Sequence, residues 1–271
     1  MNAPNPDTIE VRGVVLRRDP AREPCFTVVS LDSEMHEWPG MSEQARRERL
    51  HRHMNNEMGG LEIAAQCLAD FPDAPWELRM ELARQCWDET RHVRLLCRRL
   101  VELGGRKGEF PVSNFEWRVA GMLDSLAARL AVQNRTFEAG QMDIVGKVVD
   151  DWRAAGDERT AEMLEGILAD EIQHVRFANS WLRRLAQDDP RLLMKIAAAI
   201  RFLATVTAAL APEPGELNAV GTPIGDPRER VPMVNVDDRR LAAFTEDEIR
   251  EILRQAGFRA LLPRSESGPP A

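Results

Sequence analysis

Two stretches of sequence decide the fold of this 271-residue chain: DETRHVR at residues 88–94 and DEIQHVR at residues 170–176. Both follow the pattern D-E-x-x-H-V-R. A glutamate and a histidine three residues apart lie on one face of an α-helix. Each stretch can therefore present one carboxylate and one imidazole to the same point. The repetition predicts two such helices that face each other.

The repeat continues upstream of both motifs. EMGGLE at residues 57–62 corresponds to EAGQMD at residues 138–143, at nearly the same distance before its motif. The chain is therefore interpreted as an internal duplication of a helix pair. Inward-facing glutamates and E-x-x-H motifs on four long helices are typical of ferritin-like di-iron and di-manganese bundles. We predict an all-α fold, a ferritin-like four-helix bundle with duplicated helix pairs.

The inward glutamates and histidines predict a centre for two metal ions. Glu57 falls on an apolar stripe with Leu50 and Leu61, so its side chain should face the core. Four carboxylates in an apolar interior repel one another, and two divalent cations remove that conflict. The alternative is that these side chains merely cover a solvated helix face. The predicted ligands are Glu57, Glu89, His92, Glu138, Glu171 and His174.

Two nearby side chains are weaker candidates for metal binding. Glu62 falls on the polar side of its helix, with Asn55 and Gln66, and His53 lies one helical turn before Glu57. Packing or solvent contact is the commoner role for a histidine in that place. Four methionines at helical spacings are interpreted as core filler rather than ligands: Met54, Met58, Met122 and Met142.

The remaining pattern divides the chain into three parts. Residues 1–40 are proline-rich with two β-branched stretches, VRGVVL and CFTVVSL, which predict an extended arm or a small strand pair. Residues 41–211 form the bundle, and residues 212–271 form a loop-rich extension. The first predicted helix runs from Met41 to Phe71, and the second runs to Gly104, with Asp73 as its cap and Pro75 in its first turn. A third runs from Asn114 past Val149, and a fourth runs from the Asp157 cap to Asp188. A fifth helix is predicted over the apolar segment RLLMKIAAAIRFLATVTAAL.

The extension after Pro212 is predicted to contain one short helix. It should open at Thr245, with Glu248 three residues on completing a capping box. The final PRSESGPPA is predicted to be disordered.

Composition limits the partners and the compartment. A formal charge of −8 and a pI near 5.3 disfavour nucleic acid as a partner. The four cysteines form no C-x-x-C pair, which argues against a zinc or thioredoxin-like site and favours buried free thiols. The N-terminus has no signal-peptide pattern, and no long uncharged apolar window is found, so we expect a cytoplasmic protein without a membrane span.

The motifs also resemble known families. DETRH at residues 88–92 resembles the D-E-x-R-H motif of bacterial di-iron monooxygenases, and the doubled pattern resembles the tRNA-hydroxylase branch of the ferritin-like superfamily. A closer resemblance is to a ferritin-like family of unknown function, of the domain of unknown function 455 type. Residues 57–62, Phe71-Pro72 and residues 170–175 occupy its motif positions, while Asn55 stands where that family usually has a histidine.

Resemblance to di-metal bundles also implies a role for the aspartate in each motif. Such an aspartate commonly accepts the N–H of the ligand histidine on the opposite helix. We therefore expect Asp88 to pair with His174 and Asp170 to pair with His92. The alternative is an ordinary salt bridge from these aspartates to a neighbouring arginine, Arg91 or Arg176.

Several activities are compatible with such a centre. The chain has no tyrosine, which excludes a tyrosyl-radical reductase subunit, and no cysteine quartet, which excludes a rubrerythrin with its own rubredoxin site. The long extension after Pro212 could cover one mouth of the centre and so favours a substrate pocket. We expect a non-haem di-iron oxygenase or oxidase that uses O2, a small organic substrate and an external reductase.

Other functions and assemblies remain open. The alternatives are metal storage with ferroxidase activity, peroxide defence of the manganese-catalase type, and a non-catalytic interaction bundle. Two iron ions are the expected cofactors, although carboxylate and imidazole ligands also suit manganese and zinc. A homodimer is expected along an exposed apolar face, for which Trp117, Trp152 and the fifth helix are candidates.

Overall fold

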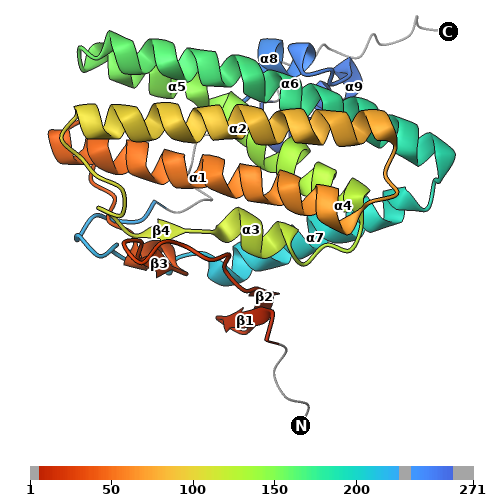
Figure 1. The fold of residues 1–271 in the computed structure, drawn as a ribbon, viewed down its shortest axis with the longest axis horizontal. Coiled ribbons are helices and arrows are strands. Elements are labelled where there is room, and N and C mark those ends of the chain that lie inside the picture. The colour runs from red at the N-terminus through yellow and green to blue at the C-terminus, as the bar shows by residue number, and fades with distance from the viewer. Residues whose placement is uncertain (1–5, 226–232, 259–271) are drawn as a thin grey trace, which may run out of the picture.

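The structure is a computed structural model that describes residues 6–225 and 233–258. It is mostly helical, which confirms the all-α class (Figure 1). The tail predicted to be disordered, residues 263–271, lies outside the described residues.

The first helix pair consists of α1 (Glu43–Asp70) and α2 (Trp76–Glu102). The Ser42 hydroxyl caps α1 by accepting a hydrogen bond from the Ala45 N–H at 3.2 Å. A turn of a few residues separates the two helices, so they pack as an antiparallel hairpin. The prediction that Asp73 caps the second helix is wrong, because Pro75 holds the N-cap position and leaves α2 without a side-chain cap.

The second pair is less regular than predicted. The prediction of one continuous helix from Asn114 past Val149 is wrong, because the chain turns at Gly121. A β-carbon there would lie 2.7 Å from Cγ of Arg17, so this close approach requires glycine. Arg129 Nε donates to the Leu123 carbonyl and closes the turn. The segments are α3 (Phe115–Ala120), α4 (Leu126–Val132), the π-helix η2 (Gln133–Glu138) and α5 (Ala139–Ala154).

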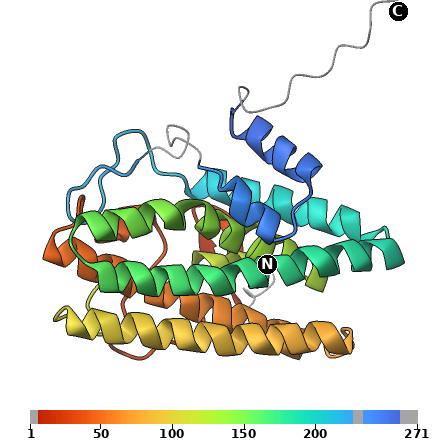
Figure 2. The same ribbon diagram turned by 90° about the horizontal axis from the view of Figure 1, so that it is seen from above.

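Helix α6 (Glu158–Asp188) completes the second hairpin. It begins, as predicted, after the Asp157 cap, whose carboxylate accepts from the Thr160 N–H at 3.0 Å. α1 packs on α2, α5 packs on α6, and α2 meets α6 across the middle (Figures 1 and 2). Apolar clusters fill both ends of this core, one around Leu78 and Trp181 and one around Leu96 and Leu164. A polar layer lies between them.

Some burial predictions fail. Trp152 is only 1% exposed, so it cannot offer an exposed dimer face, and Met122 is exposed rather than core filler. Of the four cysteines, all free, Cys67 is buried as expected, but Cys25 is exposed. Met122 lies at the break after α3 and Trp152 lies near the end of α5, where a helical period no longer predicts the buried face. Cys25 lies in a turn outside any helix.

The N-terminal segment forms two small sheets. β1 (Thr8–Val11) and β2 (Val14–Arg17) form an antiparallel hairpin around the first β-branched stretch alone. The second β-branched stretch does not join it: β3 (Val28–Val29) pairs in parallel with β4 (Val112–Ser113). A short 3-10 helix, η1 (Asp32–Glu34), follows β3. The segment is thereby attached to the bundle beside α3.

Helix α7 (Leu192–Leu210) is the predicted fifth helix. By length and composition it could cross a membrane, with a mean hydropathy of 1.7 and only 17% of its best window buried. The helix contains Lys195 and Arg201, so it is not the long uncharged apolar window whose absence was expected. These two criteria alone, met by one helix among the described residues, are weak grounds for a membrane span.

The C-terminal extension contains two helices in its described part, not one. α8 (Val236–Leu241) is capped by Asn235, and α9 (Glu246–Gln255) opens with the predicted Thr245–Glu248 capping box. Both pack over α5 and α6 through a separate apolar cluster that includes Phe244. Before them, the chain returns to the N-terminal segment, where Asn218 Nδ2 donates to the Glu37 carbonyl at 2.7 Å. The extension therefore touches two faces of the bundle.

Candidate metal centre

The polar layer of the bundle contains the six predicted ligands. They lie between the two apolar clusters, and none is more than 4% exposed. Four segments supply them: α1 gives Glu57, α2 gives Glu89 and His92, η2 gives Glu138, and α6 gives Glu171 and His174.

The six side chains form two overlapping sets. Glu57 and His92 belong to one set, Glu138 and His174 to the other, and Glu89 and Glu171 to both. Within each set the candidate ligand atoms all lie within 4.8 Å of one another. The shared carboxylates have one oxygen available to each set. Glu89 and Glu171 could therefore contribute to both sites if each set held a cation.

Both imidazole rings direct Nδ1 toward the carboxylates. Nδ1 of His92 lies 3.0 Å from Oε2 of Glu57 and 3.3 Å from Oε1 of Glu171. Nδ1 of His174 lies 3.5 Å from Oε2 of Glu171 and 3.6 Å from Oε1 of Glu89. These rings therefore offer one nitrogen each to the centre.

Several atoms of the centre have no hydrogen-bond partner within the described chain. They are Oε1 of Glu57, Oε2 of Glu89, Oε1 of Glu171 and Nδ1 of His174, all fully enclosed. Buried polar atoms without partners cost free energy, and native structures contain few of them. Bound divalent cations would satisfy these atoms at once, so the residues present fit a di-metal cofactor.

The outward nitrogen of each histidine meets an aspartate of the opposite motif. Nε2 of His92 lies 3.2 Å from Asp170 Oδ2, and Nε2 of His174 lies 3.4 Å from Asp88 Oδ2. Arg91 donates to both aspartates, at 2.7 Å to Asp88 and 2.8 Å to Asp170. The cross-pairing and the salt bridges thus occur together. Hydrogen bonding to His174 lowers the pKa of Asp88 well below its usual range.

Two amides hold the Glu138 carboxylate. Gln85 Nε2 donates to Oε1 at 2.6 Å, and Asn134 Nδ2 donates to Oε2 at 2.9 Å. The sequence interpretation did not include Gln85 or Asn134. A signal was present, since Gln85 precedes Glu89 by one helical turn and Asn134 precedes Glu138 by four residues.

The two weaker candidates do not join the ligand sets. His53 Nε2 lies 2.7 Å from Oε1 of Glu57, as an ion pair whose angle does not suit a hydrogen bond. Glu62 faces away from the centre and forms a two-point ion pair with Arg22 at 2.5 and 2.8 Å. His53 therefore contacts a candidate ligand, while Glu62 anchors the N-terminal segment.

Electrostatics show how the carboxylates share charge without a cation. Burial and the charge of Glu171 raise the pKa of Glu138 to about 8, and burial with the neighbouring carboxylates raises that of Glu89 well above its usual value. Burial alone would also raise the pKa of Glu57, but close contacts with His53 and His92 hold it well below its usual range. Protons thus neutralise part of the centre.

Comparison with known proteins supports this picture at the level of the family. Residues 8–250 match the family described as "Protein of unknown function (DUF455)". The chain belongs to this family. The matched range includes both copies of the DUF455 chain's repeat and all six residues of the centre. No curated protein and no solved structure matches the chain.

One glycine of this DUF455 chain is explained by the centre. A β-carbon on Gly60 would lie 2.9 Å from Oε1 of Glu89, so α1 can pass this close to the carboxylate only without a side chain. The adjacent Gly59 would meet nothing within 4 Å. Gly60 thus sets the distance between α1 and the Glu89 carboxylate.

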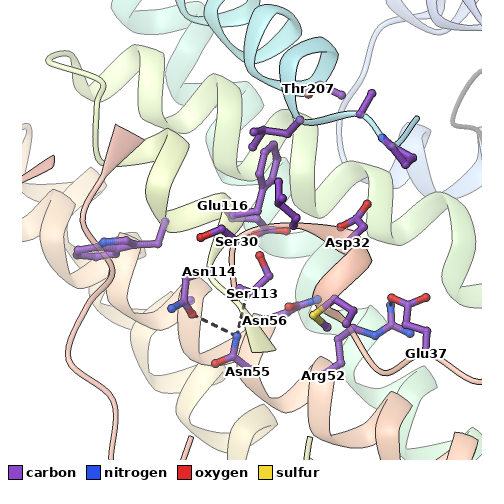
Figure 3. A pocket seen from close by; sticks show the side chains of 18 residues that line it. Ser30, Asp32, Glu37, Arg52, Asn55, Asn56, Ser113, Asn114, Glu116 and Thr207 are labelled. Carbon is purple, nitrogen blue, oxygen red and sulfur yellow. Dashed lines mark hydrogen bonds and ion pairs between the residues drawn. The ribbon is translucent and has the colours of Figure 1, made fainter. Parts of the chain in front are cut away.

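Two cavities of the DUF455 chain border the centre. The first, of about 350 Å³, lies between α1, α3, the η1 segment and the end of α7 (Figure 3). Its lining mixes polar and apolar side chains and includes Asn55, whose amide donates to the Ser113 carbonyl at 3.0 Å. The second, of about 250 Å³, lies between α1, α5 and α6. Asn56 and Glu116 line both cavities and also the small void among the carboxylates.

Glu116 is a further candidate functional residue that the sequence interpretation missed. It is half-buried at the start of α3 and accepts a hydrogen bond from Gln133 Nε2 at 3.2 Å. Burial, together with the charges of Glu57 and Glu171, raises the pKa of Glu116 to about 7. No motif marks it, because Glu116 lies on the short helix α3, outside both copies of the repeat.

Proposed function

We propose that this chain is a ferritin-like di-iron protein that acts as a non-haem oxygenase or oxidase on a small organic substrate. One observation carries the proposal. Two ligand sets overlap in Glu89 and Glu171, and cavities of about 350 and 250 Å³ adjoin them. A paired cation site beside space for an organic molecule is the arrangement that such chemistry needs.

The proposed reaction balances with one external donor. Hydroxylation consumes a substrate C–H bond, one O2, two electrons and two protons, and yields an alcohol and water. The substrate supplies two of the four electrons that O2 needs, and an external reductase supplies the other two. The iron pair, when bound, supplies the redox chemistry, while the protein provides ligands and a dry surrounding.

The chain's own residues have defined tasks in this proposal. Asp88 and Asp170 accept from Nε2 of the two histidines and thereby keep Nδ1 free of its proton and directed inward. Arg91 holds both aspartates in place. The apolar clusters at both ends of the bundle exclude water from the centre.

The cavities also favour an oxygenase over a storage protein. The end of α7 supplies Leu210, Ala211 and Pro212 to the lining of the first cavity. The extension that follows is held against the N-terminal segment by Asn218. A ferroxidase for storage needs no enclosed space for an organic molecule, whereas an oxygenase does.

The test is anaerobic iron loading of the purified protein, followed by elemental analysis and Mössbauer spectra before and after O2 exposure. Two irons per chain that O2 oxidises together are expected. Iron far above two per chain would indicate storage, and manganese with rapid O2 release from peroxide would indicate a catalase. A chain that binds no metal would contradict the proposal altogether.

A further inference from the structure

The second cavity, here named the α1–α5 cavity, has mainly apolar walls. Leu50, Trp152 and Leu164 are nearly fully buried along it, and Ile144 is 44% exposed. Its full lining is Arg49, Leu50, Arg52, His53, Asn56, Glu116, Gln141, Ile144, Val145, Val148, Trp152 and Leu164. A hydrocarbon group would therefore find apolar contacts along most of its length.

The same cavity contains one cation without an ion-pair partner. Arg52 is neutralised by Glu48 at 2.8 Å and by Glu37 at 3.2 Å. Arg49 donates to the Gly40 carbonyl at 2.9 Å, and no ion pair to it occurs among residues 6–225 and 233–258. Arg49 is therefore the group in this cavity that can accept an anionic ligand.

The cation and the metal centre lie toward opposite ends of the cavity. Arg49 precedes Glu57 by eight residues on α1, which corresponds to about 12 Å along the helix axis. Asn56, Glu116 and Gln141 line both the α1–α5 cavity and the void among the carboxylates. A ligand held at Arg49 by one end would thus reach the centre with the other.

We propose that the α1–α5 cavity binds an amphipathic carboxylate, a medium-length hydrocarbon chain whose carboxylate pairs with Arg49 and whose far end lies beside Asn56 and Gln141. One free guanidinium matches one negative charge, and its planar fork suits a carboxylate. The first cavity does not fit this ligand, because two carboxyl groups that the α1–α5 cavity lacks, those of Asp32 and Glu37, line it. Figure 3 shows several of these polar side chains around that cavity.

The position of oxidation follows from this placement and rests on the proposed function. The C–H bond nearest the centre belongs to the end of the chain remote from the carboxylate. Hydroxylation there would use O2 and the two electrons of the external reductase, and would release water. Binding itself requires no metal, so it can be tested separately.

The first experiment is calorimetric titration of the metal-free protein with octanoate, octan-1-ol and octylamine. Octanoate is expected to bind about tenfold tighter than octan-1-ol, as for a charge-assisted hydrogen bond. Arg49→Leu should abolish that difference and leave octan-1-ol unchanged. The matched control is Arg98→Leu, whose exposed side chain does not line the cavity, and it should change neither affinity. Octanoate binding that is independent of Arg49, or tighter binding of octylamine, would overturn the proposal.

The second experiment tests orientation with the unaltered chain and therefore does not depend on the folding of a variant. With paramagnetic Mn²⁺ in the centre, the methyl protons of octanoate should broaden more than the protons next to its carboxylate. The reverse order would place the carboxylate at the metal and refute the proposal. If metal loading fails but octanoate still binds through Arg49, the proposed function falls and the ligand assignment stands. If two irons bind and octanoate does not, the ligand assignment falls and the proposed function stands.

Discussion

Glu57 and Glu138 occupy equivalent places in the two copies of the repeat, yet their surroundings differ. Glu57 lies within the unbroken helix α1 and contacts His53, whereas Glu138 ends the π-helix η2 and accepts hydrogen bonds from two amides. Burial alone would raise the pKa of Glu57, but its contacts with two histidines lower it below the usual value. Burial raises the pKa of Glu138 to about 8. Duplication has kept the ligand type and changed its neighbours.

This difference teaches that the two ligand sets are not equivalent. The pKa of Glu57 is lowered and that of Glu138 is raised, so under the proposed function a cation that enters at Glu138 must displace a proton, while one that enters at Glu57 need not. The π-helix adds to the asymmetry, since such turns widen a helix locally and often occur at functional sites.

The largest effect is expected from the residues that the two positions share. Glu89→Ala should reduce the metal content from two ions per chain to nearly none, because Glu89 belongs to both ligand sets. Glu57→Ala and Glu138→Ala should each leave about one ion, because each removes a ligand from one set only. Elemental analysis after loading and desalting measures this. Equal losses in all three variants would show that the two positions do not fill separately.

A smaller effect separates Glu57 from Glu138 without any metal. Because the pKa of Glu138 is about 8 in the folded chain and near 4.5 in the unfolded one, the folded chain retains a proton over this range. The free energy of unfolding should therefore fall as the pH rises from about 5 to 8. Glu138→Gln should remove part of this slope and raise the melting temperature at pH 8 by several degrees.

Glu57→Gln is the matched control for that slope. The pKa of Glu57 is lowered in the folded chain, so its stabilising contribution is already complete above pH 5 and is lost only toward acid. The variant should lower stability about equally from pH 5 to 8 and leave the slope in place. Thermal melts in the presence of a chelator measure both variants, and identical slopes would contradict the assigned difference.

The smallest effect concerns two neighbouring glycines. Gly60→Ala places a methyl group 2.9 Å from the Glu89 carboxylate, which must shift, and metal affinity should fall about tenfold, as for changes in the surroundings of ligands. Gly59→Ala meets nothing within 4 Å and should stabilise the helix by about 0.5–1 kcal/mol with unchanged affinity. Chelator competition and melts distinguish them. Equal metal affinities of the two variants would mean that the Glu89 carboxylate can shift without loss of metal binding.

The sequence alone was sufficient to predict the helix pairs and the six residues of the polar layer. A period of three and four residues places Glu57, Glu89 and Glu171 on core faces, and the repeat supplies Glu138 by alignment. The break at Gly121 was missed because the contact that requires glycine there is with Arg17, about a hundred residues away in the chain.

Part of the environment of the centre was beyond sequence reasoning. Asn134 lies one turn before Glu138 on η2 itself, but Gln85 meets Glu138, and Glu116 meets the void among the carboxylates, only after α2, η2 and α3 have packed together. The cavities arise in the same way, since they are spaces left between helices from distant parts of the chain. The local sequence pattern predicts which face of a helix is buried, but it does not predict the cavities between that helix and its neighbours.

The division of the ligands between two hairpins also affects how the protein assembles. α1 and α2 can pair early, as can α5 and α6, because each hairpin joins neighbours in sequence. Neither hairpin alone holds a complete ligand set, since each set draws on both α2 and α6. Under the proposed function, metal capture is therefore a late event that follows the docking of the two halves. A bound cation would then slow their separation.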